Sequence, residues 1–322
     1  MIYNIHFELA TAVMLFILVL VYFIRESLPI RRNRQFLKTL FFLIVDTILS
    51  ALQCYAGGFV GKIPDIYICV LNIFVYLTGI IFIVCYYVLS IFHYKKVINF
   101  YSVINYGIFL AAAILIVTSP LTGWYFYTGS DGIIHSGMAR NIMNVLYMMT
   151  MFMTIAVAEM SGKKKDKKLY RMILVTDIII TMAAIADNIN KNSVGITMIV
   201  ANMCTFLLYF SMKSPDYYLD IRTGRFNLNG FMEVLREKID YNESVSCFLI
   251  RVQNYHAICR IYDEESLQEV QRQIAEILYY KAEDKNIYHI GAATFAVFVD
   301  STEMAKKLYE KVVKVMTHQW NV

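Results

Sequence analysis

Residues 66–92 read IYICVLNIFVYLTGIIFIVCYYVLSIF, a run without one charged side chain. A helix of this length crosses the roughly 30 Å of hydrocarbon in a bilayer at about 1.5 Å per residue. Six further apolar runs fill the first two thirds of the chain, at 7–24, 36–56, 101–118, 141–158, 172–185 and 194–210. The sequence therefore predicts about seven membrane-spanning helices, with six as the alternative because the run at 172–185 is short.

The apolar content is distributed unevenly along the chain. Hydrophobic residues make up 58% of the 322 residues, and the mean hydropathy is +0.51, more than a soluble globule of this length can bury. Residues 213–322, by contrast, carry charges throughout. We therefore expect a seven-helix membrane domain at 1–212, an α-helical transmembrane bundle, followed by a smaller α/β domain at 213–322.

The loops between the apolar runs alternate in basic charge. One side of the membrane receives thirteen basic residues and the other receives three, Lys62, Arg140 and Lys191. By the positive-inside rule, the N-terminus is outside and the C-terminal domain is cytoplasmic. This distribution indicates a multi-pass protein of the cell membrane with the lipid bilayer as partner. We find no nucleic-acid-binding motif, and nucleic acid is not an expected partner.

The longest external loop, residues 119–140, is rich in aromatic side chains around an Asp-Gly pair at 131–132. Asp-Gly between two β-prone stretches is typical of a hairpin. The aromatic residues either form an interfacial belt or the lip of a site for an external ligand that the sequence does not identify. The residues of this lip are Trp124, Tyr125, Tyr127, Asp131 and His135.

Among the acidic residues in or beside the apolar runs, we single out Asp46, Glu159, Asp177 and Asp187. An ionisable group at membrane depth often marks a transport path or a ligand counter-charge. We expect Asp46 to lie deep and the other three to lie near helix ends. A transporter with an accessory cytoplasmic domain is therefore the weaker alternative, with Asp46 as its test residue.

Residues 220–227 read DIRTGRFN and precede an amphipathic helix at 228–239. This stretch resembles the D-x-L-T-G-L-x-N opening of GGDEF domains, the diguanylate cyclase family, and matches it at Asp220, Thr223, Gly224 and Asn227. The order of the following elements is similar to that of the family: a strand at 245–252, a helix at 266–280, and a hairpin of strands at 287–290 and 295–299. The resemblance implies a palm-like α+β fold and a role in cyclic di-GMP signalling.

The positions that carry catalysis in that family have changed here. The resemblance places Arg251 at a metal-binding aspartate, and Ala293 and Thr294 at the acidic pair of the hairpin turn. Mg²⁺ requires oxygen ligands, and a guanidinium adds positive charge where the cation would lie. We expect no metal, no cofactor and no cyclase activity. Gln268 and Asn227 are the candidates left for contact with a nucleotide.

The family's domain extends about sixty residues beyond Val322, so the resemblance covers an incomplete domain. Residues 320–322 read as the start of a further strand, and an incomplete sheet leaves an edge that another chain can complete. The main interpretation is a membrane receptor whose degenerate domain relays a signal and forms a homodimer. In the alternative, the chain is the sensory part of a longer GGDEF-EAL phosphodiesterase, with the EAL domain beyond Val322.

Overall fold

The computed structural model describes residues 6–24, 27–57, 64–91, 99–129, 134–160, 167–189, 196–212, 215–253, 255–282 and 286–316. The chain divides into two compact units. The first contains residues 1–24 and 34–212, and the second contains residues 25–33 together with 213–322. Because the connection after the first helix belongs to the second unit, the two units are interleaved along the sequence.

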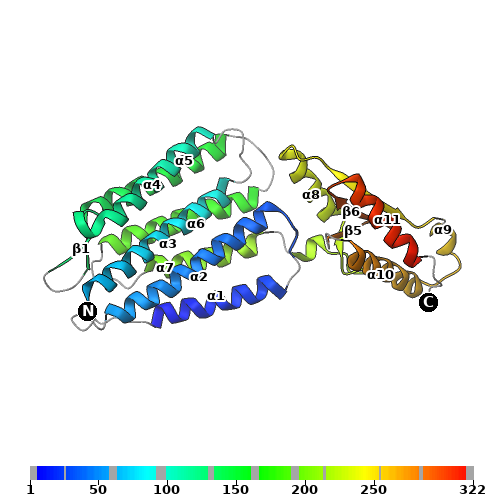
Figure 1. The fold of residues 1–322 in the computed structure, drawn as a ribbon, viewed down its shortest axis with the longest axis horizontal. Helices are drawn as coiled ribbons and strands as arrows, with labels where there is room; N and C mark the ends of the chain where they lie inside the picture. The colour runs from blue at the N-terminus through cyan, green and yellow to red at the C-terminus, as the bar shows by residue number, and fades with distance from the viewer. Residues whose placement is uncertain are drawn as a thin grey trace. The chain divides into compact units, whose positions relative to one another are not determined.

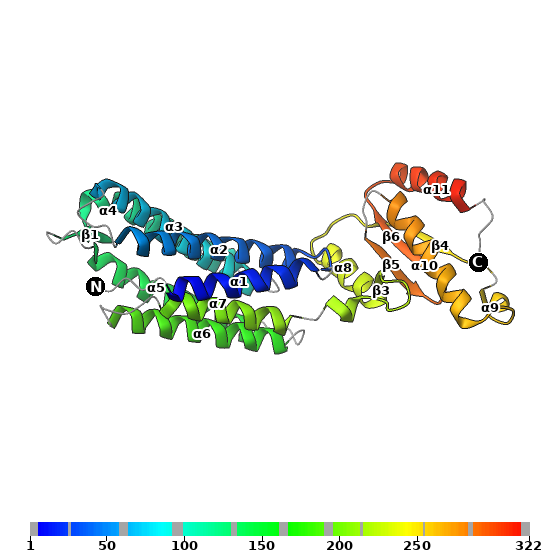
Figure 2. The same ribbon diagram turned by 90° about the horizontal axis from the view of Figure 1, so that it is seen from below.

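The first unit is helical (Figure 1). Its helices are α1 (His6–Ile24), α2 (Arg31–Gly57), α3 (Asp65–Ile91), α4 (Asn99–Thr122), α5 (Met138–Met160), α6 (Lys167–Ile189) and α7 (Ile196–Ser211). Helix α7 packs against both α1 and α6, as Figure 2 shows, and α3 packs against α4. A short antiparallel hairpin of β1 (Phe126–Thr128) and β2 (Ile134–Ser136) connects α4 to α5.

Four helical stretches of the described residues are long and apolar enough to cross a membrane: Arg31–Gly57, Asp65–Leu89, Val103–Thr122 and Ile196–Tyr218. Their outward faces carry large apolar side chains, and Phe41, Phe74 and Leu110 are each more than half exposed. Apolar surface of this extent requires lipid or protein to cover it. The structure thus supports four crossings, and the count of seven and the sidedness stay predictions.

The second unit is a mixed four-stranded sheet with helices on both faces. Its elements are the 3-10 helix η1 (Pro215–Tyr218), β3 (Phe226–Asn227), α8 (Leu228–Asp240), β4 (Ser246–Arg251), α9 (Tyr255–Ile258), α10 (Glu264–Lys281), β5 (Ile287–Gly291), β6 (Thr294–Val299) and α11 (Thr302–Met316). The strand order is β3-β5-β6-β4. Strand β3 runs parallel to β5, and the other pairs are antiparallel.

Alternation along β5 and β6 builds two hydrophobic cores, because successive side chains of a strand point to opposite faces. Ile287, Phe295 and Val297 pack against α10 and α11, whereas Tyr288 and Phe298 pack against α8 on the opposite face. The strands, the hairpin and the amphipathic helices expected between residues 226 and 299 are present, with boundaries shifted by one or two residues. Residues 320–322, where a further strand was expected, lie outside the described residues.

Candidate functional site

The turn between β5 and β6 and the end of β4 meet at one place. Arg251 is paired in register with Thr294 across the β4–β6 ladder, and the Val252 amide donates to the Ala293 carbonyl at 3.0 Å. Ala293 is buried and Arg251 is exposed. The structure therefore brings together the three positions that the GGDEF resemblance marks, and none of them carries a carboxylate.

A buried glutamine supports this turn from α10. The Gln271 side-chain amide donates to the Ala292 carbonyl at 2.5 Å and to the Tyr255 hydroxyl at 2.8 Å. Its Oε1 atom is buried without a hydrogen-bond partner among the described residues. Sequence reasoning missed Gln271, although it is the polar position on the buried stripe of α10 that continues with Ile274, Ala275 and Leu278.

The two residues left as nucleotide contacts have local partners. Asn227 is the N-cap of α8, where its Oδ1 accepts from the Gly230 amide at 3.1 Å. Its Nδ2 donates to the carbonyls of Tyr217 and Leu219 at 2.9 and 3.1 Å. Gln268 donates to Glu264 on the same helix at 3.3 Å. Asn227 is therefore fully engaged in holding the start of α8.

No group of three or more His, Cys, Asp or Glu side chains suited to a metal ion occurs in the described part of the chain. The charges nearest the turn are basic. Arg251 has no acidic partner in the described ranges, and Arg222 pairs with Glu264 at 3.7 Å in an exposed position. An exposed pair of this kind contributes little stability. Arg251, Ala293 and Thr294 therefore offer no acidic group to a cation at this turn.

Asp220 pairs with His289 of β5, whose side chain is buried, while Asp220 is partly exposed. His289 Nδ1 lies 2.6 Å from Asp220 Oδ2, and the other carboxylate oxygen accepts from the Arg222 and Thr223 amides at 2.8 and 3.3 Å. Burial acts to raise the pKa of Asp220, but the hydrogen bonds from His289 and the backbone outweigh it and hold that pKa below its usual range. The matching Asp220 of the GGDEF-like opening thus fixes the 220–227 loop onto β5.

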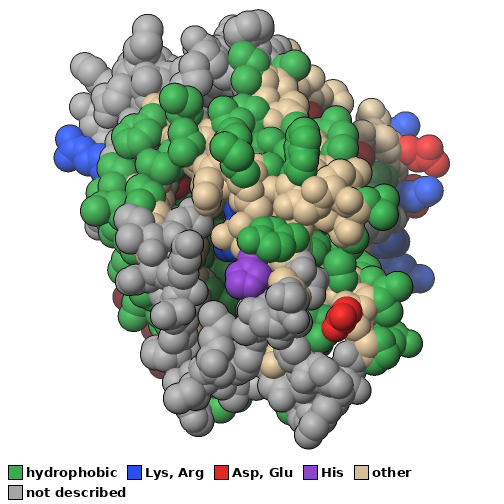
Figure 3. Space-filling view, turned by 90° about the vertical axis from the view of Figure 1, so that its left-hand side faces the viewer, with side chains coloured by type: hydrophobic (Ala, Val, Ile, Leu, Met, Phe, Trp, Pro, Cys, Tyr) green, Lys and Arg blue, Asp and Glu red, His purple; other side chains and the backbone are tan. Residues whose placement is uncertain are grey.

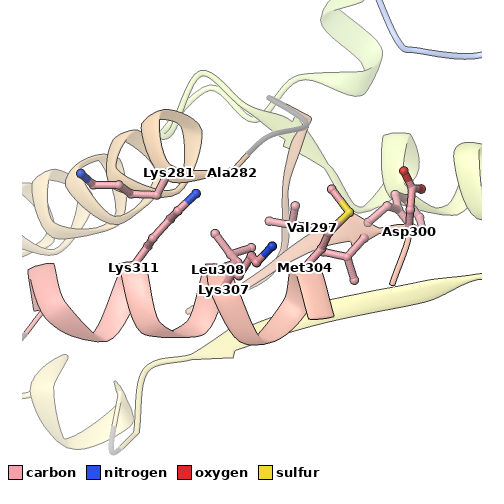
Figure 4. Close-up of a pocket in the computed structure, with 10 residues that line it drawn as sticks. Lys281, Ala282, Val297, Asp300, Met304, Lys307, Leu308 and Lys311 are labelled. Carbon is pink, nitrogen blue, oxygen red and sulfur yellow. The ribbon is translucent and has the colours of Figure 1, made fainter. Parts of the chain in front are cut away.

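One cavity of about 40 Å³ lies between α10, β6 and α11 (Figure 4). Val297 and Leu308 line it, and Lys281, Lys307 and Lys311 contribute ammonium groups around it. Sites for organic ligands occupy about 300–1,000 Å³. At about 40 Å³ the cavity is too small for a nucleotide.

The described residues proposed as a sensing lip lie in the β1–β2 hairpin or just before it. Tyr127 and His135 stack with their ring centroids 5.4 Å apart, and Trp124 is 63% exposed. Tyr125 is buried instead, with its ring 5.4 Å from that of Tyr76 on α3. Asp131 lies outside the described residues. Figure 3 views the end of the first unit that carries this hairpin, and hydrophobic side chains predominate among its coloured atoms.

Arg140 joins this aromatic group, although the sequence marked it only as a topological charge. Its guanidinium carbon lies 5.2 Å from the centroid of the Tyr76 ring, and Nη1 donates weakly to the Tyr76 hydroxyl at 3.4 Å. The Ala139 amide donates to the Trp124 carbonyl at 2.9 Å, which fixes the hairpin to the first turn of α5. The lip therefore consists of exposed aromatic rings beside one cation that has no acidic partner in the described ranges.

The segment between α1 and α2 is anchored in the second unit. Leu28 and Ile30 are each 2% exposed and belong to the core formed with Tyr218, Phe226, Val234 and Tyr288. The Arg31 amide donates to both carboxylate oxygens of Glu237 at 2.8 and 3.0 Å. The Arg31 guanidinium also pairs with Glu243 and lies 3.9 Å above the Tyr241 ring. Sequence reasoning treated this segment only as a positively charged loop.

Comparisons with protein-family models, curated proteins and solved structures find no match for this chain.

Proposed function

We propose that this protein is a membrane-embedded signalling receptor whose C-terminal α/β domain relays a signal without catalysis. The observation that carries the proposal is the anchoring of residues 28–31 in the core of that domain. These residues connect α1, which ends at Ile24, to α2, which begins at Arg31. Because α2 begins within this segment, at Arg31, we propose that a rearrangement of α2 displaces part of the C-terminal fold.

Packed cores transmit such displacements because they are close-packed and not freely deformable. Leu28 lies directly against α8: a Cβ atom added at Gly230 would meet Leu28 Cδ1 at 3.2 Å. Glu237, which binds the Arg31 amide, is on the same helix. Helix α8 is therefore the element that receives the displacement, and it packs against β5.

The non-catalytic part of the proposal is supported by the residues at the β5–β6 turn. Arg251, Ala293 and Thr294 supply no metal-binding carboxylate at the position where the resemblance expects a pair of divalent ions. Cyclic di-GMP signalling is the pathway that the resemblance suggests for the relay. We propose the cytoplasm as the location of this domain, from the thirteen-to-three distribution of basic residues. We propose the edge of β4, which pairs with no second strand among the described residues, as the surface for a homodimer.

A double-mutant experiment tests the relay in the full chain reconstituted in lipid nanodiscs. Phe36→Ala perturbs the core of the first unit, where Phe36 is fully buried. The readout is hydrogen exchange at the amides of α8. We expect Phe36→Ala to increase exchange in α8, and to lose this effect when Leu28→Ala is also present, because the docked segment carries the coupling.

Two outcomes contradict the proposal. If exchange in α8 is the same in wild-type protein and Phe36→Ala, the units are not coupled. If the effect of Phe36→Ala persists unchanged in the Leu28→Ala background, the coupling does not run through residues 28–31. The catalytic part is tested separately: the reconstituted protein with GTP and Mg²⁺ should produce no cyclic di-GMP, and any enzymatic product would refute the degenerate reading of the turn.

A further inference from the structure

Two of the acidic residues singled out in the apolar runs, Asp46 and Asp177, have described side chains, and Asp177 is the more deeply buried of the two. The expectation that it lies near a helix end is wrong: it is in the middle of α6, because that helix begins five residues before the apolar run, at Lys167. Asp177 is 3% exposed. Its neighbour Thr176 is fully buried, and Tyr86 on α3 is 2% exposed.

The hydrogen bonds of the Asp177 carboxylate are incomplete. The Tyr86 hydroxyl is its hydrogen-bond donor, and the same hydroxyl is bonded to the Thr176 hydroxyl. The Oδ1 atom of Asp177 is buried and has no hydrogen-bond partner among the described residues. A buried polar atom left without a partner costs about 1–3 kcal/mol, and more when it is charged.

No positive charge compensates Asp177 within the described ranges. The titratable groups that face it are Tyr86 from α3 and Cys204 from α7, whose thiol lies 3.8 Å from the Thr176 carbonyl oxygen. Both are neutral or, when ionised, negative. A carboxylate in such surroundings is retained only if a proton or a bound cation neutralises it. Asp46 also accepts from one hydroxyl, that of Thr78 at 2.8 Å, but it is less enclosed, and neither of its oxygens is among the buried atoms without a partner.

We propose that Asp177, with the hydroxyls of Tyr86 and Thr176, is a binding site for a monovalent cation, either the proton or an alkali-metal ion. The site goes beyond the proposed relay and exists whether or not the relay does. Its groups come from two helices, α3 and α6, and Cys204 of α7 packs beside them, so we expect occupancy to change how these helices pack. The proton and an alkali-metal ion would each place a single positive charge on one carboxylate. The experiment below distinguishes between them.

The experiment measures thermal unfolding of the full chain in nanodiscs, for wild-type protein, Asp177→Asn and the control Asp46→Asn. In one arm the pH is varied with a bulky organic cation as the only salt. In the other, Na⁺ or K⁺ replaces that cation at fixed pH. Unfolding is followed in the first unit, so that the acid-dependent contribution of Asp220 in the second unit does not enter. We expect the wild-type unfolding temperature of that unit to rise with occupancy, Asp177→Asn to lose this rise, and Asp46→Asn to keep it.

The two arms identify the ligand. A response to pH alone assigns the proton, and a response to alkali ions alone assigns the metal ion. A response to both assigns competition for one carboxylate. The proposal is overturned if wild-type protein responds to neither, or if Asp177→Asn responds as the wild type does.

Tyr86→Phe provides a second variant that keeps the carboxyl group and so does not depend on Asp177→Asn folding well. Its missing hydroxyl no longer donates to the ionised carboxylate, and hydrogen bonds to charged groups are among the stronger ones. If the ligand is the proton, we expect its affinity to increase by about ten-fold or more, because the ionised carboxylate loses a donor. If the ligand is an alkali-metal ion, we expect its affinity to fall, because the site loses an oxygen ligand. Unchanged affinity in Tyr86→Phe would show that the hydroxyl does not belong to the site and would overturn the assignment.

Discussion

Leu28→Ala should release the segment between α1 and α2 from the C-terminal domain. Burying Leu28 and Ile30 contributes about 1.5–3 kcal/mol each, and ordering residues 28–30 costs about 1–2 kcal/mol per residue. These contributions nearly cancel. The bond from the Arg31 amide to the Glu237 carboxylate, at 2.8 and 3.0 Å, then leaves a net docking free energy of about 1.5–3 kcal/mol. The docked form is favoured roughly ten- to hundred-fold.

Truncating a buried leucine costs about 2–5 kcal/mol, which is equal to or larger than this docking free energy. The segment in Leu28→Ala should therefore be mostly undocked. Hydrogen exchange of the Arg31 amide measures this directly, because Arg31 is the first residue of α2 and its N–H has no acceptor within its own helix. We expect protection of about ten- to hundred-fold in wild-type protein and little in the variant.

The matched control is Leu249→Ala, the same chemical change in the same unit at a side chain that is 59% exposed. It should leave exchange at Arg31 unchanged. Equal protection of the Arg31 amide in wild-type protein and Leu28→Ala would refute the docking argument, because the amide would then owe its protection to something other than the buried leucine.

Three further predictions concern the C-terminal domain, each measured by chemical unfolding of the full chain followed in that domain. Asn227→Ala should lower stability by about 1–2 kcal/mol because α8 loses its N-cap; no change would mean that the cap is dispensable. Gly230→Ala should destabilise the domain, because the new Cβ would lie 3.3 Å from the Tyr218 carbonyl oxygen and 3.2 Å from Leu28. Overpacking costs about 1–3 kcal/mol, which exceeds the gain in helix propensity of about 1 kcal/mol. A more stable variant would contradict this prediction. The pKa of Asp220 is lowered in the folded state, so its stabilising contribution is present above the ordinary aspartate pKa of about 4 and is lost as the pH falls below that value. Asp220→Asn should remove this acid-dependent loss of stability. An Asp220→Asn variant with the wild-type pH profile would refute the stabilising role of the Asp220–His289 pair.

Local patterns were sufficient for the elements of the second unit. The alternation Tyr288, Ala296, Phe298 against Ile287, Phe295, Val297 is visible in the sequence and matches the two faces of the sheet. The Asp-Gly pair predicted the β1–β2 hairpin because turn chemistry is local. The apolar runs predicted the helices of the first unit for the same reason: length and hydropathy are properties of a segment.

Pairings between distant segments could not be predicted in this way. Leu28 and Ile30 were counted within a basic loop, and their burial against α8 depends on residues about two hundred positions away. Arg140 was assigned to membrane topology, and Tyr125 to an exposed lip, because neither the Tyr76 ring nor the packing of the hairpin is visible in their own neighbourhood.

The sequence by itself determined where apolar segments, turns and sheet strands lie, and which chemistry the β5–β6 turn lacks. A residue type such as Ala293 or Arg251 excludes a carboxylate ligand whatever the fold. Only the tertiary structure decided which polar groups are buried together. Asp177 and Tyr86 are separated by ninety-one positions and share one hydrogen bond. The burial of Asp177 without a basic partner in the described ranges is a property of three packed helices, since burial and solvation depend on every neighbour in space.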